Sequence, residues 1–106
     1  MAAIILLVAS CGKTEQNPLL SNFDTPHQTP PFGKIKAEHY EPAFDVAIEE
    51  AKKEVEQIAS SKETPTFENT IVALDNIGEK MNAISGIFFN LNACLTDSLM
   101  QAIAQH

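Results

Sequence analysis

The chain has 106 residues, about the size of one small domain. It carries 14 Asp and Glu residues against 7 Lys, no Arg and no Trp, for a formal net charge of −7. We therefore expect no nucleic-acid partner, because binding phosphates requires clustered Lys or Arg. Two cysteines are too few for a disulfide framework or a four-cysteine zinc site, and the 44% apolar content excludes a wholly disordered chain.

Residues 1–10 have the pattern of a bacterial lipoprotein signal peptide. The uncharged run MAAIILLVA is followed by Ser10 and then Cys11, the order typical of a lipoprotein cleavage site. Nine apolar residues span about 14 Å as a helix, which suits a signal peptide but is too short for a bilayer core of about 30 Å. We expect a lipidated Cys11 that anchors the protein in the cell envelope, on the periplasmic side or at the outer membrane. The run lacks a leading Lys or Arg, so a buried apolar N-terminus stays an alternative.

Residues 11–37 are expected to form a tether and an extended arm. Prolines interrupt this stretch and disfavour regular helix, both at their own positions and in the residues before them. Its later part also carries apolar side chains that predict packing on a helical body. The prolines are Pro18, Pro26, Pro30 and Pro31, and the apolar residues are Leu19, Leu20, Phe23, Phe32 and Ile35.

Residues 38–106 are expected to form the helical segment, and its first helix is predicted over 42–59. Pro42 suits the first turn, and Glu49 and Lys53 have the spacing of a favourable helical ion pair. The charged residues of this stretch indicate a solvated face. The apolar residues recur at steps of three and four, as on one face of a helix: Tyr40, Phe44, Ala47, Ile48, Ala51, Val55, Ile58 and Ala59.

The same spacing predicts one continuous helix over 67–92, with Thr66 as its N-cap and Glu68 in its first turn. Its apolar positions are Phe67, Ile71, Leu74, Gly78, Met81, Ile84 or Ser85, Phe88, Leu91 and Leu95. Such a helix is about 39 Å long, whereas a compact 100-residue domain has a radius of gyration of about 13 Å. The pattern therefore indicates that the helix needs more partners than residues 38–59 provide.

A third helix is predicted to start at Thr96 or Asp97, with Leu99, Met100 and Ile103 beginning its apolar face. The fold class is therefore all-α, with an extended proline-rich arm followed by long antiparallel helices. The third helix continues to His106 without a Gly or Pro stop signal, so we expect the segment to be incomplete.

The residues that could carry chemistry favour structural roles. The three histidines, His27, His39 and His106, have no helical pair spacing, so we expect no metal site in this chain. We expect Cys94 to be a small buried hydrophobe. Phe88 and Phe89 are expected to pack in a core that buries the helix on two sides, with a substrate contact over 67–95 as the alternative.

Several motifs, in order, resemble the amino-terminal segment of bacterial peptidyl-dipeptidases, which are zinc metallopeptidases related to oligopeptidase A and thimet oligopeptidase. The similarity covers residues 17–105, and its most specific part is PTFENTIVAL at 65–74. The other matching segments are NPLL at 17–20, PPFGKI at 30–35, HYEPAF at 39–44 and FFNL at 88–91.

This resemblance implies that the chain is part of a large helical peptidase that cleaves short peptides at zinc. In the family, the histidines of an H-E-x-x-H motif and a further glutamate hold the metal, and the motif's glutamate activates the zinc-bound water. No residue of this chain corresponds to them, so we expect neither a catalytic residue, a zinc ligand nor activity here. The expected partners are short peptides, the remainder of the peptidase chain and, through Cys11, a membrane. The alternative is a small non-catalytic lipoprotein that serves as a binding module.

Overall fold

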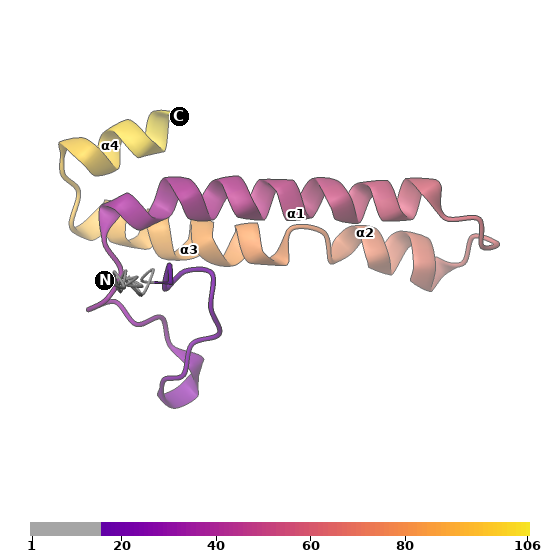
Figure 1. Cartoon of the computed structure of the whole chain (residues 1–106), viewed down its shortest axis with the longest axis horizontal. Helices are drawn as coiled ribbons and strands as arrows, with labels where there is room; N and C mark the ends of the chain where they lie inside the picture. Colours follow the sequence, from indigo (N-terminus) through magenta and orange to yellow (C-terminus); the bar gives the residue numbers. More distant parts are fainter. Residues whose placement is uncertain (1–15) are drawn as a thin grey trace, which may run out of the picture.

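A computed structural model describes residues 16–106, and every regular element in that range is a helix. Two long helical segments lie side by side and run in opposite directions, and a short helix lies next to one end of the pair (Figure 1). The all-α prediction is therefore confirmed. The helices are η1 (Pro26–Gln28), η2 (Ala37–His39), α1 (Tyr40–Ser60), η3 (Phe67–Val72), α2 (Ala73–Asp75), α3 (Glu79–Cys94) and α4 (Ser98–Gln105).

The start of α1 is held by hydrogen bonds from the arm. The Asn17 side chain donates to the His39 carbonyl oxygen over 2.8 Å, and His39 Nδ1 accepts from the Lys36 N–H over 3.0 Å. Pro42 lies in the first turn as predicted, where its missing N–H leaves no helical acceptor unpaired. Leu19 is buried in the core, whereas Phe32 is 52% exposed, so the prediction that the arm's apolar residues lie on the body is wrong for Phe32.

The prediction of one helix over 67–92 is wrong. The segment begins as the π-helix η3, continues through the single turn of α2 and breaks before α3. Gly78 adopts φ 73° and ψ 25°, a left-handed conformation that ends one helix and begins the next. Its N–H donates to Glu54 Oε2 of α1 over 2.9 Å, so a contact from another helix stabilises the break.

The predicted N-cap Thr66 is confirmed, and of the two candidates Thr96 and Asp97 for the last helix the structure selects Asp97. Thr66 Oγ1 accepts from the Asn69 N–H over 3.1 Å, and Asn69 Oδ1 accepts from the Thr66 N–H over 2.7 Å. Asp97 Oδ1 accepts from the Met100 N–H over 2.8 Å and begins α4. Each side chain replaces a helical acceptor that the first turn lacks.

One ion pair joins the two long segments, and another lies within α1. Lys80 Nζ of α3 lies 2.6 Å from Glu50 Oε2 of α1, close to the break at Gly78. Within α1, Lys52 pairs with Glu49 over 2.7 Å. The predicted pairing of Lys53 with Glu49 is wrong, since the lysine that pairs with Glu49 is Lys52, three residues along the helix.

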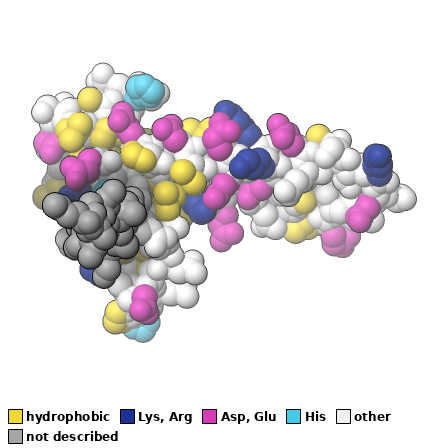
Figure 2. Space-filling model, in the orientation of Figure 1, with side chains coloured by type: hydrophobic (Ala, Val, Ile, Leu, Met, Phe, Trp, Pro, Cys, Tyr) yellow, Lys and Arg dark blue, Asp and Glu magenta, His cyan; other side chains and the backbone are white. Residues whose placement is uncertain are grey.

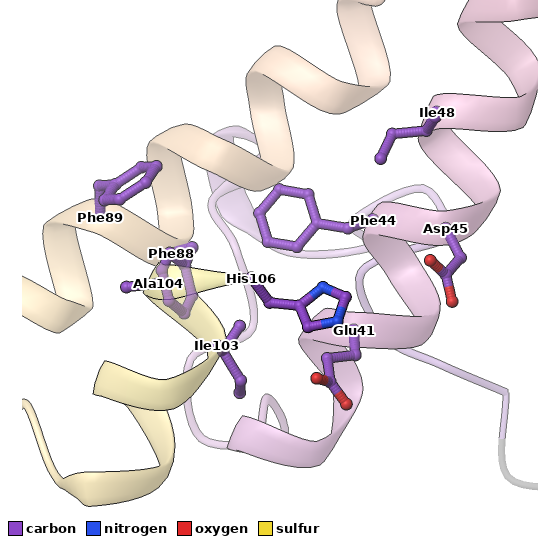
Figure 3. A pocket seen from close by; sticks show the side chains of 9 residues that line it. All are labelled: Glu41, Phe44, Asp45, Ile48, Phe88, Phe89, Ile103, Ala104 and His106. Atoms are coloured by element: carbon purple, nitrogen blue, oxygen red, sulfur yellow. The ribbon is translucent and has the colours of Figure 1, made fainter.

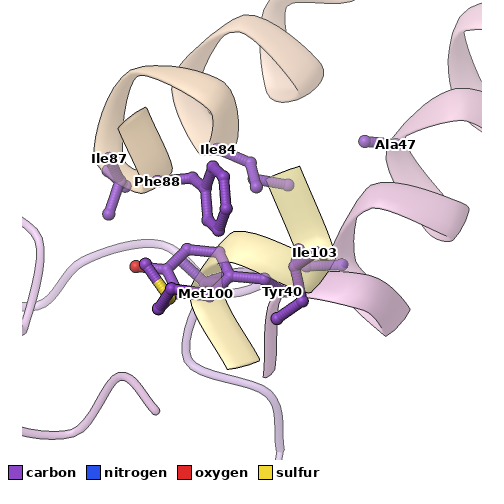
Figure 4. Packing of buried hydrophobic residues seen from close by; sticks show 9 residues of the cluster. Tyr40, Ala47, Ile84, Ile87, Phe88, Met100 and Ile103 are labelled. Carbon is purple, nitrogen blue, oxygen red and sulfur yellow. The ribbon is translucent and has the colours of Figure 1, made fainter. Parts of the chain in front are cut away.

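The core lies at one end of the helical pair, where α1, α3, α4 and the arm meet (Figure 4). Tyr40, Ala43, Ile84 and Phe88 are at most 1% exposed. The remaining core residues are Leu19, Ala47, Ile87, Met100 and Ile103. The opposite end contributes none of them, and the Cα radius of gyration is 20.0 Å, against about 13 Å for a compact domain of this size.

Candidate functional site

An open groove lies beside the core, between α1, α3 and α4 (Figure 3). Its volume is about 460 Å³. The first turns of α1, the C-terminal half of α3 and the end of α4 supply its walls. The lining residues are Glu41, Phe44, Asp45, Ile48, Phe88, Phe89, Ile103, Ala104 and His106.

The floor of the groove is aromatic. Phe88 is buried, and its ring meets those of Tyr40, Phe44 and Phe89 edge to face, with centroid distances of 4.9, 5.8 and 5.1 Å. These edge-to-face contacts stabilise the cluster beyond the burial of its apolar area. Phe89 nevertheless leaves 57% of its surface in solvent and Ile48 leaves 40%, so the floor presents apolar surface to the outside.

The rim of the groove is acidic. Glu41 and Asp45 lie one helical turn apart on α1, and both are exposed. Neither belongs to an ion pair among residues 16–106. The His106 side chain lies between Phe44 and Glu41 in Figure 3. The groove therefore combines apolar contact area with negative charge that the described part of the chain does not neutralise.

A polar atom is enclosed beneath the groove. The Tyr40 side chain is buried, and its hydroxyl has no hydrogen-bond partner within the described residues. Burial raises the pKa of this phenol, because the charged phenolate is disfavoured away from water. The hydroxyl stays neutral at physiological pH and contributes no charge to the groove.

The structure does not bring the three histidines together. His27 lies in η1 of the arm, His39 is engaged at the start of α1 and His106 follows α4. Within residues 16–106, no three His, Cys, Asp or Glu side chains form a group that could hold a metal ion. The described residues therefore do not fit a zinc site. The expected lipidation residue, Cys11, lies outside the described residues.

The prediction that Cys94 is buried is wrong, because its side chain is exposed. Cys94 is the last residue of α3, and α4 packs on the Phe88 side of that helix and leaves this end uncovered. Core packing is confirmed for Phe88 but is wrong for Phe89 within this chain. Among the described residues, no helix combines the length and apolar character required to span a membrane.

Asn90 and Asn92 have local hydrogen-bond partners. The Asn90 side chain donates to the Gly86 carbonyl oxygen over 2.7 Å, and Asn92 Oδ1 accepts from Thr96 Oγ1 over 2.8 Å. Both amides therefore help to hold α3 and its C-terminal turn. The acidic pair Glu41 and Asp45 is the feature that sequence reasoning missed, although its i,i+4 spacing was a usable signal.

A second exposed apolar surface lies at the far end of the molecule, on η3 and α2. We call it the tip patch, and it consists of Phe67, Ile71, Val72 and Leu74, which are 66%, 51%, 40% and 49% exposed. These residues also line a shallow depression with Asp75. The predicted apolar stripe is thus present, but α1 does not cover it at this end.

No family model matches the chain. Over 87 residues the chain is 36% identical to a dipeptidyl carboxypeptidase from Salmonella typhimurium, and over 90 residues it is 34% identical to one from Escherichia coli. These matches cover 82% and 85% of this chain but 13% of each relative. Oligopeptidase A from Escherichia coli is 32% identical over 77 residues, which is 73% of this chain and 11% of that protein. The chain is therefore homologous to a limited part of the dipeptidyl carboxypeptidase and oligopeptidase A sequences.

Proposed function

We propose that this chain is the amino-terminal helical segment of a zinc-dependent peptidyl-dipeptidase or oligopeptidase that cleaves short peptides. The observation that carries the proposal is the identity of 36% over 82% of the chain, matched to only 13% of the relative. Most of such an enzyme, including its zinc ligands, would lie outside the segment. The segment would then serve as structure that packs on the remaining peptidase body.

The exposed apolar surface supports this role. The groove and the tip patch lie at opposite ends of the molecule, and both present large apolar side chains to solvent. Contiguous exposed apolar patches mark surfaces that contact other protein. The radius of gyration of 20.0 Å also supports a packing role, because an elongated helical hairpin exposes more of its apolar surface to neighbouring structure than a compact domain does.

The segment alone is proposed to be inactive. Its sequence has no H-E-x-x-H motif, and residues 16–106 offer no group of metal ligands. The test is a peptidase assay on the purified chain with added zinc and short peptides. We expect hydrolysis at the background rate, and turnover that EDTA abolishes would refute the proposed inactivity.

The size of the native protein tests the assignment itself. An antibody against residues 38–80, used on membrane and soluble fractions of the source cells, should detect a band several times larger than 11.6 kDa. A band near 11 kDa would contradict the proposal. It would favour the second candidate, a small lipoprotein whose exposed groove binds another protein.

Lipid anchoring through Cys11 is a separate part of the proposal. The apolar run before Cys11 supports it, because that order is typical of lipoprotein signals. Cells grown with labelled palmitate should incorporate the label into the protein, and Cys11→Ser should abolish incorporation. Unchanged labelling of the variant would refute lipidation at this residue.

A further inference from the structure

The groove between α1, α3 and α4 offers apolar surface of a size that suits protruding side chains. Its volume of about 460 Å³ lies within the usual range of binding pockets, about 300–1,000 Å³. Phe89 of α3 and Ile48 of α1 present apolar surface to solvent at the two sides of the groove floor. A groove bounded by helices with apolar walls commonly receives the apolar face of another helix.

The charge at the rim restricts which helix can bind. Glu41 and Asp45 lie on the α1 wall without a cation partner in the described structure. Figure 2 shows further Asp and Glu side chains along the length of the helical pair on the face in view. An occupant with Lys or Arg beside its apolar face would neutralise the rim, whereas an acidic occupant would be repelled.

Charge also argues against two other occupants. A second copy of this chain carries a net charge of −7 and the same acidic rim, so electrostatic repulsion opposes self-association here. An anionic lipid surface would be repelled by the same carboxylates. A basic partner remains the occupant that satisfies both the floor and the rim.

We infer that the groove is the docking site of a basic amphipathic helix, with Leu-type or Phe-type side chains on the floor and Lys or Arg against Glu41 and Asp45. If the proposed function holds, this helix belongs to the remainder of the peptidase. The inference then identifies the chemistry by which the segment is attached to that remainder.

The test measures binding of the full chain to a labelled helical peptide of 14 residues made of Leu and Lys, by fluorescence anisotropy. A Leu and Glu peptide of the same spacing is the charge-reversed probe. We expect Phe89→Ser to weaken binding by about tenfold or more, as loss of an aromatic anchor does. We expect Glu41→Gln combined with Asp45→Asn to weaken binding several-fold and to reduce its dependence on salt. Circular dichroism verifies that each variant is folded.

Matched controls separate the groove from general attraction of a basic peptide to an acidic protein. Phe32→Ser removes an exposed phenylalanine from the arm, outside both the groove and the tip patch, and Glu56→Gln combined with Glu63→Gln removes two carboxylates away from the groove. Both controls should bind the Leu and Lys peptide within about twofold of the unaltered chain, as substitutions outside an interface do. Equal losses in controls and groove variants would overturn the inference, as would tight binding of the Leu and Glu peptide.

Self-association provides a further outcome. Sedimentation velocity that shows a dimer sensitive to Phe89→Ser, without peptide binding, would identify a second copy as the occupant and overturn the inference. The peptide-binding and sedimentation results do not depend on the proposed function, because they report only what occupies the groove. If the native protein is large but this chain does not bind the peptide, only the inference about the groove is refuted. If the native protein is near 11 kDa and binds the peptide, only the peptidase assignment is refuted.

Discussion

The break between α2 and α3 predicts that one kind of substitution has opposite effects at two glycines. Gly78 has a φ of 73°, which an alanine rarely adopts, whereas Gly86 lies inside α3 with helical backbone. Each Gly→Ala substitution adds the same methyl group, so a difference between the two variants reflects the backbone conformation at each position. We expect Gly78→Ala to lower the free energy of unfolding and Gly86→Ala to raise it.

The magnitude at Gly78 follows from the backbone alone. A Cβ there would lie 3.4 Å from Met81 Cε and 3.9 Å from Ala51 Cβ, which is ordinary contact without overlap. The left-handed conformation costs an alanine about 1–2 kcal/mol. Alanine also reduces the conformational entropy of the unfolded chain, which offsets about 0.4–1 kcal/mol of that cost. The expected net loss of stability is therefore about 1 kcal/mol.

At Gly86 nothing lies within 4 Å of the new Cβ, so steric cost is absent. Alanine in a helix interior is favoured over glycine by about 0.5–1 kcal/mol. With a urea m-value near 1 kcal/mol/M for a small protein, the two midpoints should move in opposite directions by about 0.5–1 M.

The assay is urea unfolding followed by circular dichroism at 222 nm. Gly78→Asn is the control for conformation, because Asn tolerates the left-handed region, and its stability should fall between those of the Gly and Ala proteins. If Gly78→Ala proved as stabilising as Gly86→Ala, residue 78 would lie in a continuous helix and the break would be refuted.

Three further changes test the packing. Tyr40→Phe should leave stability unchanged or raise it by up to about 1–3 kcal/mol, because it removes a buried hydroxyl without a partner among the described residues, and a loss measured by urea unfolding would contradict this. Asp97→Ala should destabilise α4 by about 1 kcal/mol, measured by amide exchange of its residues, and Asp97→Asn should retain the cap. Lys52→Gln should cost little stability and only at intermediate pH. The hydrogen bond and charge of Lys52 lower the pKa of Glu49, so the stabilisation by this pair is lost in acid, as the pH falls through the lowered pKa of Glu49. Glu49 in turn raises the pKa of Lys52, so the stabilisation is lost in alkali as the pH rises through that raised pKa.

The local features of the fold could be predicted because they depend on nearby residues. The first helix, predicted over 42–59, runs over Tyr40–Ser60, since its apolar spacing and Pro42 act within a few turns. Thr66 and Asp97 were recognisable as caps for the same reason, because a cap bonds an N–H three residues away.

The break at Gly78 could not be predicted from spacing. Ile71, Leu74, Gly78 and Met81 keep steps of three and four across it, so the pattern of a continuous helix persists where the helix stops. The carboxylate that accepts the Gly78 N–H comes from Glu54, 24 residues earlier in the chain. The packing of α1 against this segment brings that acceptor to Gly78, and the sequence around residue 78 does not indicate it.

The groove could be predicted only in part, because apolar spacing does not say which apolar face is covered. Ile48 fits the predicted stripe of its helix as well as Ala47 does, and Phe89 is as apolar as its neighbour Phe88. Ile48 and Phe89 nevertheless face solvent, whereas Ala47 and Phe88 are buried. Ala47 and Phe88 belong to the core cluster, whereas Ile48 and Phe89 border the groove, which α4 bounds but does not fill. We propose that this uncovered apolar surface binds a partner and that the carboxylates of Glu41 and Asp45 beside it select for a basic one.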